Sequence, residues 1–510
     1  MPVHSHISVI MFLVATLVGC ASLPEEIKHP IEPLVTQSTN TLTELTDNYR
    51  PEHPKQGTSA VLLQDTGWDA LAQRLALIET AEHSIDIQYY IWNADASGHY
   101  LANRLIAAAD RGVQVRVMLD DINLDERENL LAALDLHPKI EIRIFNPIPS
   151  RRGFVKWLNV LSDFSRLNRR MHNKSFTVDG VLSIVGGRNI GDEYFDLSDE
   201  VNFRDRDVLV MGTVVIDIQA SFLQYWNSSW SYPVNLLADK VPSDIPVLDE
   251  MAAPRYKHYP ALPEGNESAN RFLKDLMDEM IWVKARFVSD LPVPVDVDNT
   301  NEPKAIARLL AELALQADQE ILLESAYLIF DDSQLKELQL LSRNGVQIKA
   351  LTNSMASNDL VTNHSGYAGR RRDILHHGIK LFELKPDTKL CEESTRDLSK
   401  CAPTAAYGLH AKSVVFDRRV AAIGSFNFNL RSTYLNTESM LVIENQNVAE
   451  SLADHMEQAM NEDNSWRLNL RDGKLRWYSG TKIWESEPET DLSERIKSRF
   501  LQLLPIEKYL

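Results

Sequence analysis

The chain contains 510 residues, of which 44% are hydrophobic and 25% charged, and its formal net charge is −19. These fractions are typical of a globular protein, and the length allows two or three domains with a large buried core. General binding to nucleic acid needs a basic surface that releases counterions from phosphate, so the acidic balance argues against a nucleic-acid partner. The simplest interpretation of the charge is a soluble acidic surface.

The N-terminus carries an apolar run, Ile7 to Val18, followed by Gly19 and Cys20. The run is too short to cross a bilayer as a permanent helix and is typical of a signal peptide. The tetrad that ends in Cys20 resembles a bacterial lipobox, in which the cysteine is lipidated and becomes the first residue of the mature protein. That resemblance implies a signal peptide over residues 1–19, a lipid anchor facing the periplasm and, because Ala21 follows, sorting to the outer membrane. The alternatives are an uncleaved anchor and an unlipidated signal peptide.

The segment 20–57 is rich in Pro, Thr, Glu and Asn and has no clean period, which predicts a tether between the lipid and the folded body. After it, strands and helices alternate. The expected elements are a strand over 61–65, a helix around 71–78, a strand over 85–92, a helix over 101–109 and a strand over 113–119.

The second half repeats this order. Its expected elements are a strand over 286–290, a helix over 306–317, a strand over 321–327 and a strand that ends at 349. Alternation of strands and helices predicts α/β layers, and a period above about 200 residues indicates a duplicated domain rather than a solenoid. We expect a first domain over 58–241, a Pro-rich linker with a short helix over 242–280, and a second domain over 281–510. Such duplicates pack about a pseudo-twofold axis, where matching loops face each other.

One constellation occurs once in each half. The first copy is His172, Lys174, Asp179, Gly186 and Asn189, and the second is His410, Lys412, Asp417, Gly424 and Asn427. The intervals between the five residues are the same in both. A base or nucleophile, a cation and an amide donor are the parts needed to hold and attack a phosphate. The two copies therefore predict one active site shared by the halves.

Local patterns around the constellation predict its backbone. Each histidine precedes an apolar run, and the steps Asp179-Gly180 and Asp417-Arg418-Arg419 indicate hairpin turns between two strands. Histidine and lysine lie two residues apart on a strand and project from one face. Glycine before Asn189 and Asn427 lets the backbone approach the site closely and directs the amide into it.

Cys391 and Cys401 lie in a polar loop. In an exported chain such a close pair suggests a disulfide. A zinc site is disfavoured because the loop holds no other Cys or His.

The pattern His-x-Lys-x4-Asp followed by Gly-(Gly/Ser)-x-Asn, present twice, resembles the phospholipase D superfamily. The stretches 169–180, 186–192, 424–427 and 431–438 resemble in particular its bacterial cardiolipin synthase C type. The resemblance extends from about residue 58 to the C-terminus. It implies an α/β fold of two phospholipase-D-like α/β/α sandwich domains related by pseudo-twofold symmetry.

The resemblance also implies a mechanism. One histidine attacks phosphorus and forms a phosphatidyl-histidine, while the other protonates the leaving alcohol and then deprotonates the incoming one. We expect His172 to be the nucleophile and His410 the acid. The phosphate-binding residues are expected to be Lys174, Lys412, Asn189, Asn427 and Ser425. No metal or other cofactor is needed, because two ammonium groups and two amides supply the positive field. Asp179 and Asp417 are expected to brace the motif rather than react.

An imidazole needs an acid on its other nitrogen to fix its tautomer. Glu438, which follows His410 in the second half, fits the family's orienting acid. In the first half we expect Asp205 in this role, with Asp207 and Glu200 as alternatives. The first copy has Gly187 where the second has Ser425, so its phosphate cradle lacks a hydroxyl and the halves are not chemically equivalent.

Two stretches raise the question of membrane contact. Residues 145–166 interleave aromatic residues with Arg151, Arg152, Lys156 and Arg166, which predicts either an amphipathic rim that enters the bilayer surface or a helix packed over the second domain. The C-terminal stretch 496–504 offers the same choice, and we expect it to pack in the core.

These observations predict a phosphatidyltransferase that makes cardiolipin. Its substrates would be membrane phospholipids: phosphatidylglycerol as acceptor, and phosphatidylglycerol or phosphatidylethanolamine as donor. The sequence leaves any protein partner open. The rival hypotheses are a phospholipase D hydrolase that releases phosphatidic acid, a nuclease, and a non-catalytic envelope scaffold.

Overall fold

The protein is described from a computed structural model. The described residues are 31–33, 40–51, 57–124, 127–148, 164–238, 259–292, 299–395, 397–502 and 507–509. The expected signal peptide, Cys20 and Ala21 lie outside them, as do residues 149–163 of the expected rim. Within the described residues, no helix combines the length and the apolar character needed to cross a membrane.

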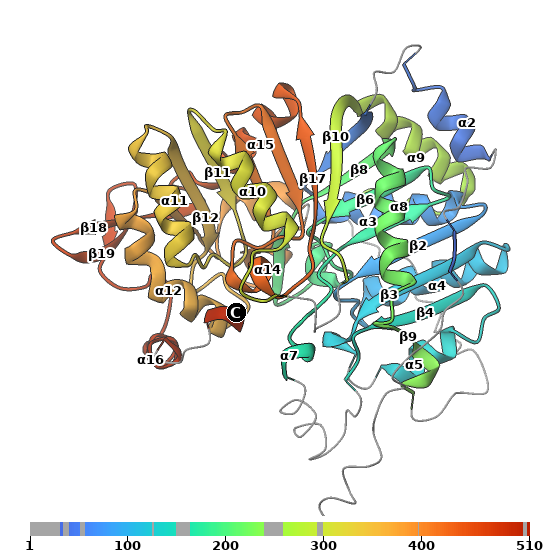
Figure 1. The fold of residues 1–510 in the computed structure, drawn as a ribbon, viewed down its shortest axis with the longest axis horizontal. Coiled ribbons are helices and arrows are strands. Elements are labelled where there is room, and N and C mark those ends of the chain that lie inside the picture. The colour runs from blue at the N-terminus through green and yellow to red at the C-terminus, as the bar shows by residue number, and fades with distance from the viewer. Residues whose placement is uncertain are drawn as a thin grey trace, which may run out of the picture.

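The first half is a mixed sheet with helices on its faces (Figure 1). Its strands run in the order β9-β4-β3-β2-β5-β6-β8-β1, with β2, β3 and β4 parallel. The strands are β1 (Thr58–Gln64), β2 (Ser84–Tyr89), β3 (Gln114–Asp120), β4 (Ile140–Phe145), β5 (Ser175–Val178), β6 (Leu182–Gly186), β8 (Asp207–Gly212) and β9 (Ser231–Pro233). The helices are α3 (Gly67–Thr80), α4 (Ala96–Asp110), α5 (Glu128–Leu134), α8 (Val214–Trp226) and α9 (Asn266–Glu279).

The second half repeats this arrangement strand for strand. The order is β10-β17-β16-β15-β11-β12-β13-β18, extended by β19 and β20. The strands are β10 (Ile281–Ser289), β11 (Glu320–Glu324), β12 (Gln347–Asn353), β13 (Lys380–Leu384), β15 (Ser413–Phe416), β16 (Val420–Gly424), β17 (Ser439–Glu444), β18 (Ser465–Arg471), β19 (Lys474–Ser479) and β20 (Lys482–Trp484). The helices are α10 (Ala305–Leu315), α11 (Asp332–Arg343), α12 (Val361–His376), α14 (Leu430–Tyr434), α15 (Gln446–Ala459) and α16 (Leu492–Leu501).

The two halves join edge to edge through β1 and β10, which pair antiparallel from Thr58 with Lys284 to Val61 with Ile281. An antiparallel pair places equal elements on opposite sides of a local twofold axis, so the strand orders of the halves mirror each other about this seam. The α/β fold with two related halves is confirmed. One continuous sheet runs through both.

The helices cover both faces of this sheet. On one face near the seam, α8 and α15 bury their apolar residues in a single cluster that also holds strand residues of both halves, such as Val61 and Val415. Helix α15 begins where the Asn445 side chain accepts a hydrogen bond from the Val448 amide, and its stripe of Val448, Leu452 and Met456 is fully buried. Separate clusters under α3 and α4, and under α10 and α12, form the cores of the individual halves.

Two segments differ from expectation. Part of the expected tether is folded, because α2 (Thr41–Asp47) buries Leu42 and Leu45 against the first half. Two apolar residues were too few to reveal a periodic pattern in a polar segment. The C-terminal stretch was expected in the core, but Ile496 and Phe500 of α16 are 57% and 63% exposed. That expectation is wrong, because the one buried residue of α16 is Ser498.

Cys391 and Cys401 form a disulfide. The loop between them contacts the first half: Lys400 donates to the carbonyl of Leu197, and Asn202 donates to the carbonyl of Lys400. The disulfide loop therefore supports a segment of the first half that leads into the site.

Candidate active site

Backbone pairing between the halves brings the two histidines to one place. β7 (Val201–Arg204) and β14 (Ala406–Leu409) pair in parallel, and the His410 amide donates to the carbonyl of Arg204 at 2.8 Å. On the other side of the pseudo-twofold axis, the His172 amide donates to the carbonyl of Thr437 at 2.9 Å. The backbone just before each histidine thus pairs with a segment of the opposite half. That segment also carries the acid that orients the histidine.

Glu438 orients His172. Its Oε2 accepts a hydrogen bond from His172 Nδ1 at 2.8 Å, because a carboxylate has no proton to give. Two hydroxyl groups, those of Ser425 and Ser432, each donate to Glu438 at 2.6 Å. The carboxylate is completely buried and multiply held, so the imidazole keeps one orientation and leaves Nε2 for chemistry.

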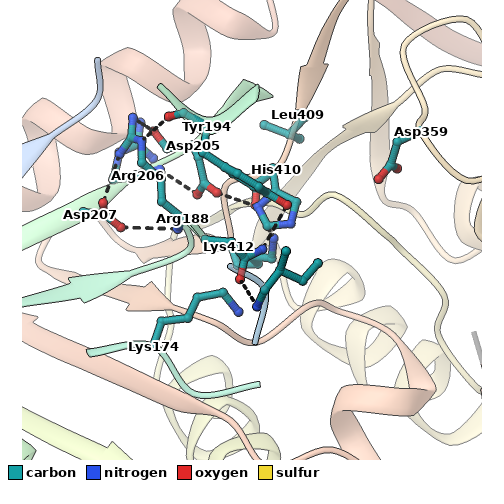
Figure 2. Close-up of polar contacts among 12 residues, drawn as sticks. Lys174, Arg188, Tyr194, Asp205, Arg206, Asp207, Asp359, Leu409, His410 and Lys412 are labelled. Carbon is teal, nitrogen blue, oxygen red and sulfur yellow. Dashed lines mark hydrogen bonds and ion pairs between the residues drawn. The ribbon is translucent and has the colours of Figure 1, made fainter. Parts of the chain in front are cut away.

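Asp205 orients His410 in the same way, with 2.5 Å between His410 Nδ1 and Asp205 Oδ2 (Figure 2). The Arg206 amide donates to the other carboxylate oxygen at 2.7 Å. A Cβ atom at Gly187 would lie 2.2 Å from Asp205 Oδ1. Gly187 therefore leaves the room that this shorter acid occupies, whereas the second half has Ser425 and the longer Glu438.

The two orienting acids predicted from the sequence are therefore in place, and the structure pairs each of them with the histidine of the opposite half. The physical reason is the cross-pairing of the backbone: Asp205 follows Arg204, and Glu438 follows Thr437, the residues that bond to the opposite histidine segments. The alternatives for the first acid lie elsewhere. Asp207 forms an ion pair with Arg74 at 2.8 Å, and Glu200 is exposed.

Ser425 does not hold phosphate as expected. Its single hydroxyl proton is directed to Glu438, and its oxygen accepts from the Ser439 amide at 2.9 Å. The residue is fully buried behind the acid. It therefore helps to position His172. The difference between Gly187 and Ser425 affects how the two orienting acids are held, not how phosphate is bound.

The lysines of the two motifs lie beside the imidazoles. Lys174 Nζ donates to the carbonyl of His172 at 2.8 Å, and Lys412 Nζ donates to the carbonyl of His410. Lys412 Nζ also lies 2.9 Å from His410 Nδ1. Since that nitrogen gives its proton to Asp205, this contact is the close approach of a cation. Figure 2 shows both lysine side chains extending toward the space below His410.

Burial and mutual repulsion set the charges in this space. Burial lowers the pKa of His172 to about 4, and burial together with Lys412 lowers the pKa of His410 to about 3. Burial, reinforced by Lys412, lowers the pKa of Lys174 to about 7, and burial lowers the pKa of Lys412 to about 8. The free site therefore holds neutral imidazoles at neutral pH. A bound phosphodiester anion would favour the charged forms of all four groups.

These shifts predict the pH dependence of catalysis. As the pH rises through about 7 to 8 the free site loses ammonium charge, so kcat/KM will fall on the alkaline side. The alkaline fall of kcat will occur at higher pH than that of kcat/KM, because bound phosphate keeps the lysines charged. Pre-steady-state and steady-state rates on labelled phosphatidylglycerol between pH 5 and 10 measure both limbs.

Lys174→Arg is the matched control, because a guanidinium stays charged over this range. In this variant the alkaline fall of kcat/KM should move to higher pH, where only Lys412 still loses its proton. A fall at the same pH as in the parent would show that Lys174 does not cause it.

The two amides behave differently. Asn189 Nδ2 donates to the Tyr194 hydroxyl at 2.9 Å, and its oxygen accepts from the Ile91 amide. Asn427 Oδ1 is buried and has no hydrogen-bond partner among the described residues. Because an amide oxygen accepts, this atom is suited to a hydroxyl group of a ligand, whereas the Nδ2 of Asn427 is the atom that could donate to a phosphate oxygen.

Asp179 and Asp417 lie at the far turns of their hairpins, away from the imidazoles. Asp179 accepts from the amides of Glu82, His83 and Ser84, and Asp417 accepts from those of Asp318, Gln319 and Glu320. Each carboxylate thereby ties the β5–β6 or β15–β16 turn to the start of β2 or β11. Their contacts are those of bracing residues.

Asp179→Ala should therefore lower stability more than it lowers catalysis. It removes the acceptor of three backbone amides, and we expect a loss of about 3 kcal/mol in the free energy of unfolding. Urea denaturation measures this loss, and kcat per folded molecule should change by less than about fivefold. A large fall in kcat at unchanged stability would show that the carboxylate takes part in the reaction.

The structure adds residues that the sequence did not indicate. Tyr90 lies edge-on to His172, with 4.8 Å between ring centres, and Tyr194 lies edge-on to His410 at 5.1 Å. Ser432 belongs to a stretch that carried the family resemblance, but its contact with Glu438 depends on the turn made by α14. Asp359 lies across from His410 in Figure 2 and accepts from the Tyr327 hydroxyl at 3.0 Å. None of these residues has a repeated counterpart at a fixed spacing, so no pattern marked them.

Known proteins resemble this chain in sequence and in fold. The sequence family described as "Cardiolipin synthase, PLD-like domain" matches residues 75–226 and 310–460, one match in each half. The chain belongs to this family. It is a phospholipase-D-type enzyme with both motifs complete.

Among its relatives, cardiolipin synthase C of Escherichia coli (strain K12) is 38% identical over 467 residues, which are 89% of this chain and 97% of that protein. A cardiolipin synthase of Geobacillus kaustophilus is 24% identical over 76% of this chain and 63% of its own length. The crystal structure of a phosphatidylserine synthase from Haemophilus influenzae has the same fold, with a TM-score of 0.57, 13% identity, and coverage of 92% of this chain and 100% of that one.

Proposed function

We propose that this phospholipase-D-like protein is a cardiolipin synthase that transfers a phosphatidyl group to the glycerol head group of phosphatidylglycerol. The observation that carries the proposal is the pair of buried imidazoles, each bound through Nδ1 to the acid of the opposite half, with a lysine beside each. A relative named cardiolipin synthase C over nearly the whole chain supports the same substrate class.

In the first step, Nε2 of His172 attacks phosphorus of the donor phospholipid. The bond between phosphorus and the head-group oxygen breaks, and His410 gives the proton that the leaving alcohol needs. In the second step, His410 takes the proton of the incoming glycerol hydroxyl, whose oxygen attacks phosphorus and displaces His172. The ammonium groups of Lys174 and Lys412 and the Nδ2 of Asn427 would donate to the non-bridging oxygens as their negative charge grows.

The acceptor distinguishes the proposal from its nearest rival. Water in place of the glycerol hydroxyl would make the protein a hydrolase that releases phosphatidic acid. Purified protein is incubated with vesicles that contain phosphatidylglycerol with a labelled glycerol backbone, with and without phosphatidylethanolamine. We expect labelled cardiolipin, and a faster rate with phosphatidylethanolamine would identify the donor. Phosphatidic acid as the sole labelled product would overturn the proposal.

We also propose that the mature protein is anchored by a lipid on Cys20 and faces the periplasm, with the outer membrane favoured by Ala21. The lipobox-like tetrad before Cys20 supports this placement. Labelling cells with a radioactive fatty acid tests it: the wild-type protein should carry the label and the Cys20→Ser variant should not. Equal labelling of the two would refute lipidation at this residue.

A further inference from the structure

The C-terminal helix α16 presents an apolar stripe to solvent. Leu492, Ile496 and Phe500 recur at every fourth position and are 67%, 57% and 63% exposed. Ser498, on the other side of the helix, is buried. The helix is well formed at its start, where Asp491 and Glu494 make a reciprocal capping box. A helix of this kind keeps its three large apolar side chains in water, which costs free energy unless another phase covers them.

The charge of α16 identifies the chemistry of that phase. Between Leu492 and Leu501 the sequence has Arg495, Lys497 and Arg499 against Glu494, whereas the whole chain has a formal net charge of −19. The acidic surface of the rest of the protein would be repelled by anionic phospholipid head groups, whereas this basic segment would be attracted to them. Apolar residues with flanking cations are typical of helices that lie in a membrane interface.

A second exposed apolar group lies near the active site. The rings of Phe164 in α7 (Phe164–Leu167) and Tyr509 in η6 (Glu507–Tyr509) are in contact at 5.0 Å between centres, and they are 42% and 40% exposed. Arg431 donates to the carbonyls of Tyr509 and Asn168. This places the aromatic pair beside the start of the His172 segment.

Both groups lie on one side of the molecule. Figure 1 shows α16, the C-terminus and α7 along its lower edge. Helix α16 packs against α12, which begins directly after Asp359 and the 46%-exposed Leu360. Asp359 is the residue that faces His410 across the site. The exposed apolar side chains therefore belong to segments that adjoin both histidines: the aromatic pair adjoins the His172 segment, and α16 packs on the helix that follows Asp359.

We propose that α16 and the Phe164–Tyr509 pair form a docking surface for an anionic phospholipid bilayer, so that the active site faces the membrane from which its substrates come. The proposal rests on the proposed function for its substrate class. A tether at the N-terminus would keep the protein near a membrane but would leave its orientation open. The docking surface would supply the orientation, because its two groups lie on the side of the molecule where the His172 segment and α12 begin.

The first test reads the position of α16 directly. In the full chain, Phe500→Cys is labelled with the fluorophore NBD, and vesicles of phosphatidylglycerol and phosphatidylcholine are added. Leu340→Cys is the matched control, because Leu340 is a 60%-exposed residue near the C-terminal end of α11, outside the proposed docking surface. Cys391 and Cys401 are joined in the disulfide, and the parent chain treated with the dye serves as the blank for Cys20.

We expect the emission at position 500 to shift to the blue and rise several-fold with phosphatidylglycerol, less with phosphatidylcholine alone, and not at position 340. A water-like emission at position 500 with vesicles would overturn the proposal. So would a shift that depends on protein concentration without lipid, because it would show that a second copy covers the helix.

The second test reads the consequence for turnover. Leu492→Ser, Ile496→Ser and Phe500→Ser combined should lower the rate on vesicles about tenfold and leave the rate on lipid dispersed in detergent micelles within about twofold. The control combines Ile216→Ser, Leu315→Ser and Leu340→Ser, which are 51%, 66% and 60% exposed and lie on other helices. An equal loss in both lipid forms, or the same loss in the control, would overturn the docking surface. Absence of turnover by the parent would count against the proposed function alone, because the NBD measurement does not need catalysis.

Discussion

His410→Asn will accumulate a phosphatidyl group on His172, whereas His172→Asn will acquire none. The reason is the inequality of the two imidazoles. Burial lowers the pKa of both imidazoles, and the cation of Lys412, 2.9 Å from His410 Nδ1, lowers that of His410 further, whereas Lys174 bonds to the carbonyl of His172. The more basic imidazole is the better nucleophile, and the more acidic one is the better proton donor to a leaving alcohol.

Both variants should lose about ten-thousandfold in steady-state rate. The distinguishing measurement is mass spectrometry of peptides after a single incubation with a phosphatidyl donor that has a good leaving group, such as p-nitrophenol, since such a donor needs no acid. A phosphatidyl mark at residue 172 in His410→Asn supports the assignment. A mark at residue 410 in His172→Asn would reverse the two roles.

The second large effect concerns the two orienting acids, each of which bonds to the histidine of the opposite half. In the His410→Asn background, the single-turnover rate of marking His172 should fall about a hundredfold or more on adding Glu438→Gln, because the amide no longer fixes the reactive tautomer. Adding Asp205→Asn to the same background should change that rate by less than about threefold, since the histidine that Asp205 orients is already absent.

The comparison of these two double variants is internally matched, because each replaces one buried carboxylate by its amide. If each acid served its own half, the effects would be exchanged. Circular dichroism melts of both variants show whether a lost rate reflects lost folding: equal melting temperatures with unequal rates are the expected outcome.

Much of this arrangement could be predicted from local sequence. The hairpins around Asp179 and Asp417 follow from apolar runs separated by turn residues, and the structure forms them as β5–β6 and β15–β16. The doubled spacing of the motif predicted two related halves because identical intervals require identical local folds. Both kinds of inference need only contacts between residues that are close in the chain.

The pairing of the acids could not be predicted in this way. Asp205 and His410 are 205 residues apart, and what joins them is the backbone pairing of β7 with β14. Similarly, a stripe of Leu492, Ile496 and Phe500 has the same period whether it faces a core or solvent, so the sequence gives the helix but not its surroundings. The role of Ser425 depends on the fold in the same way, because a hydroxyl in such a motif can donate to a ligand or to a neighbouring side chain, and the fold brings Glu438 within 2.6 Å of it.

The seam between β1 and β10 has a consequence for how such an enzyme changes over time. If the same site were built from two identical chains, every substitution would appear on both sides of the axis, and the two histidines would stay equivalent until substrate bound. Here Gly187 and Ser425 differ, as do Asp205 and Glu438, because both halves are encoded in one chain. Fusion therefore allows each histidine to be tuned separately for attack or for proton transfer.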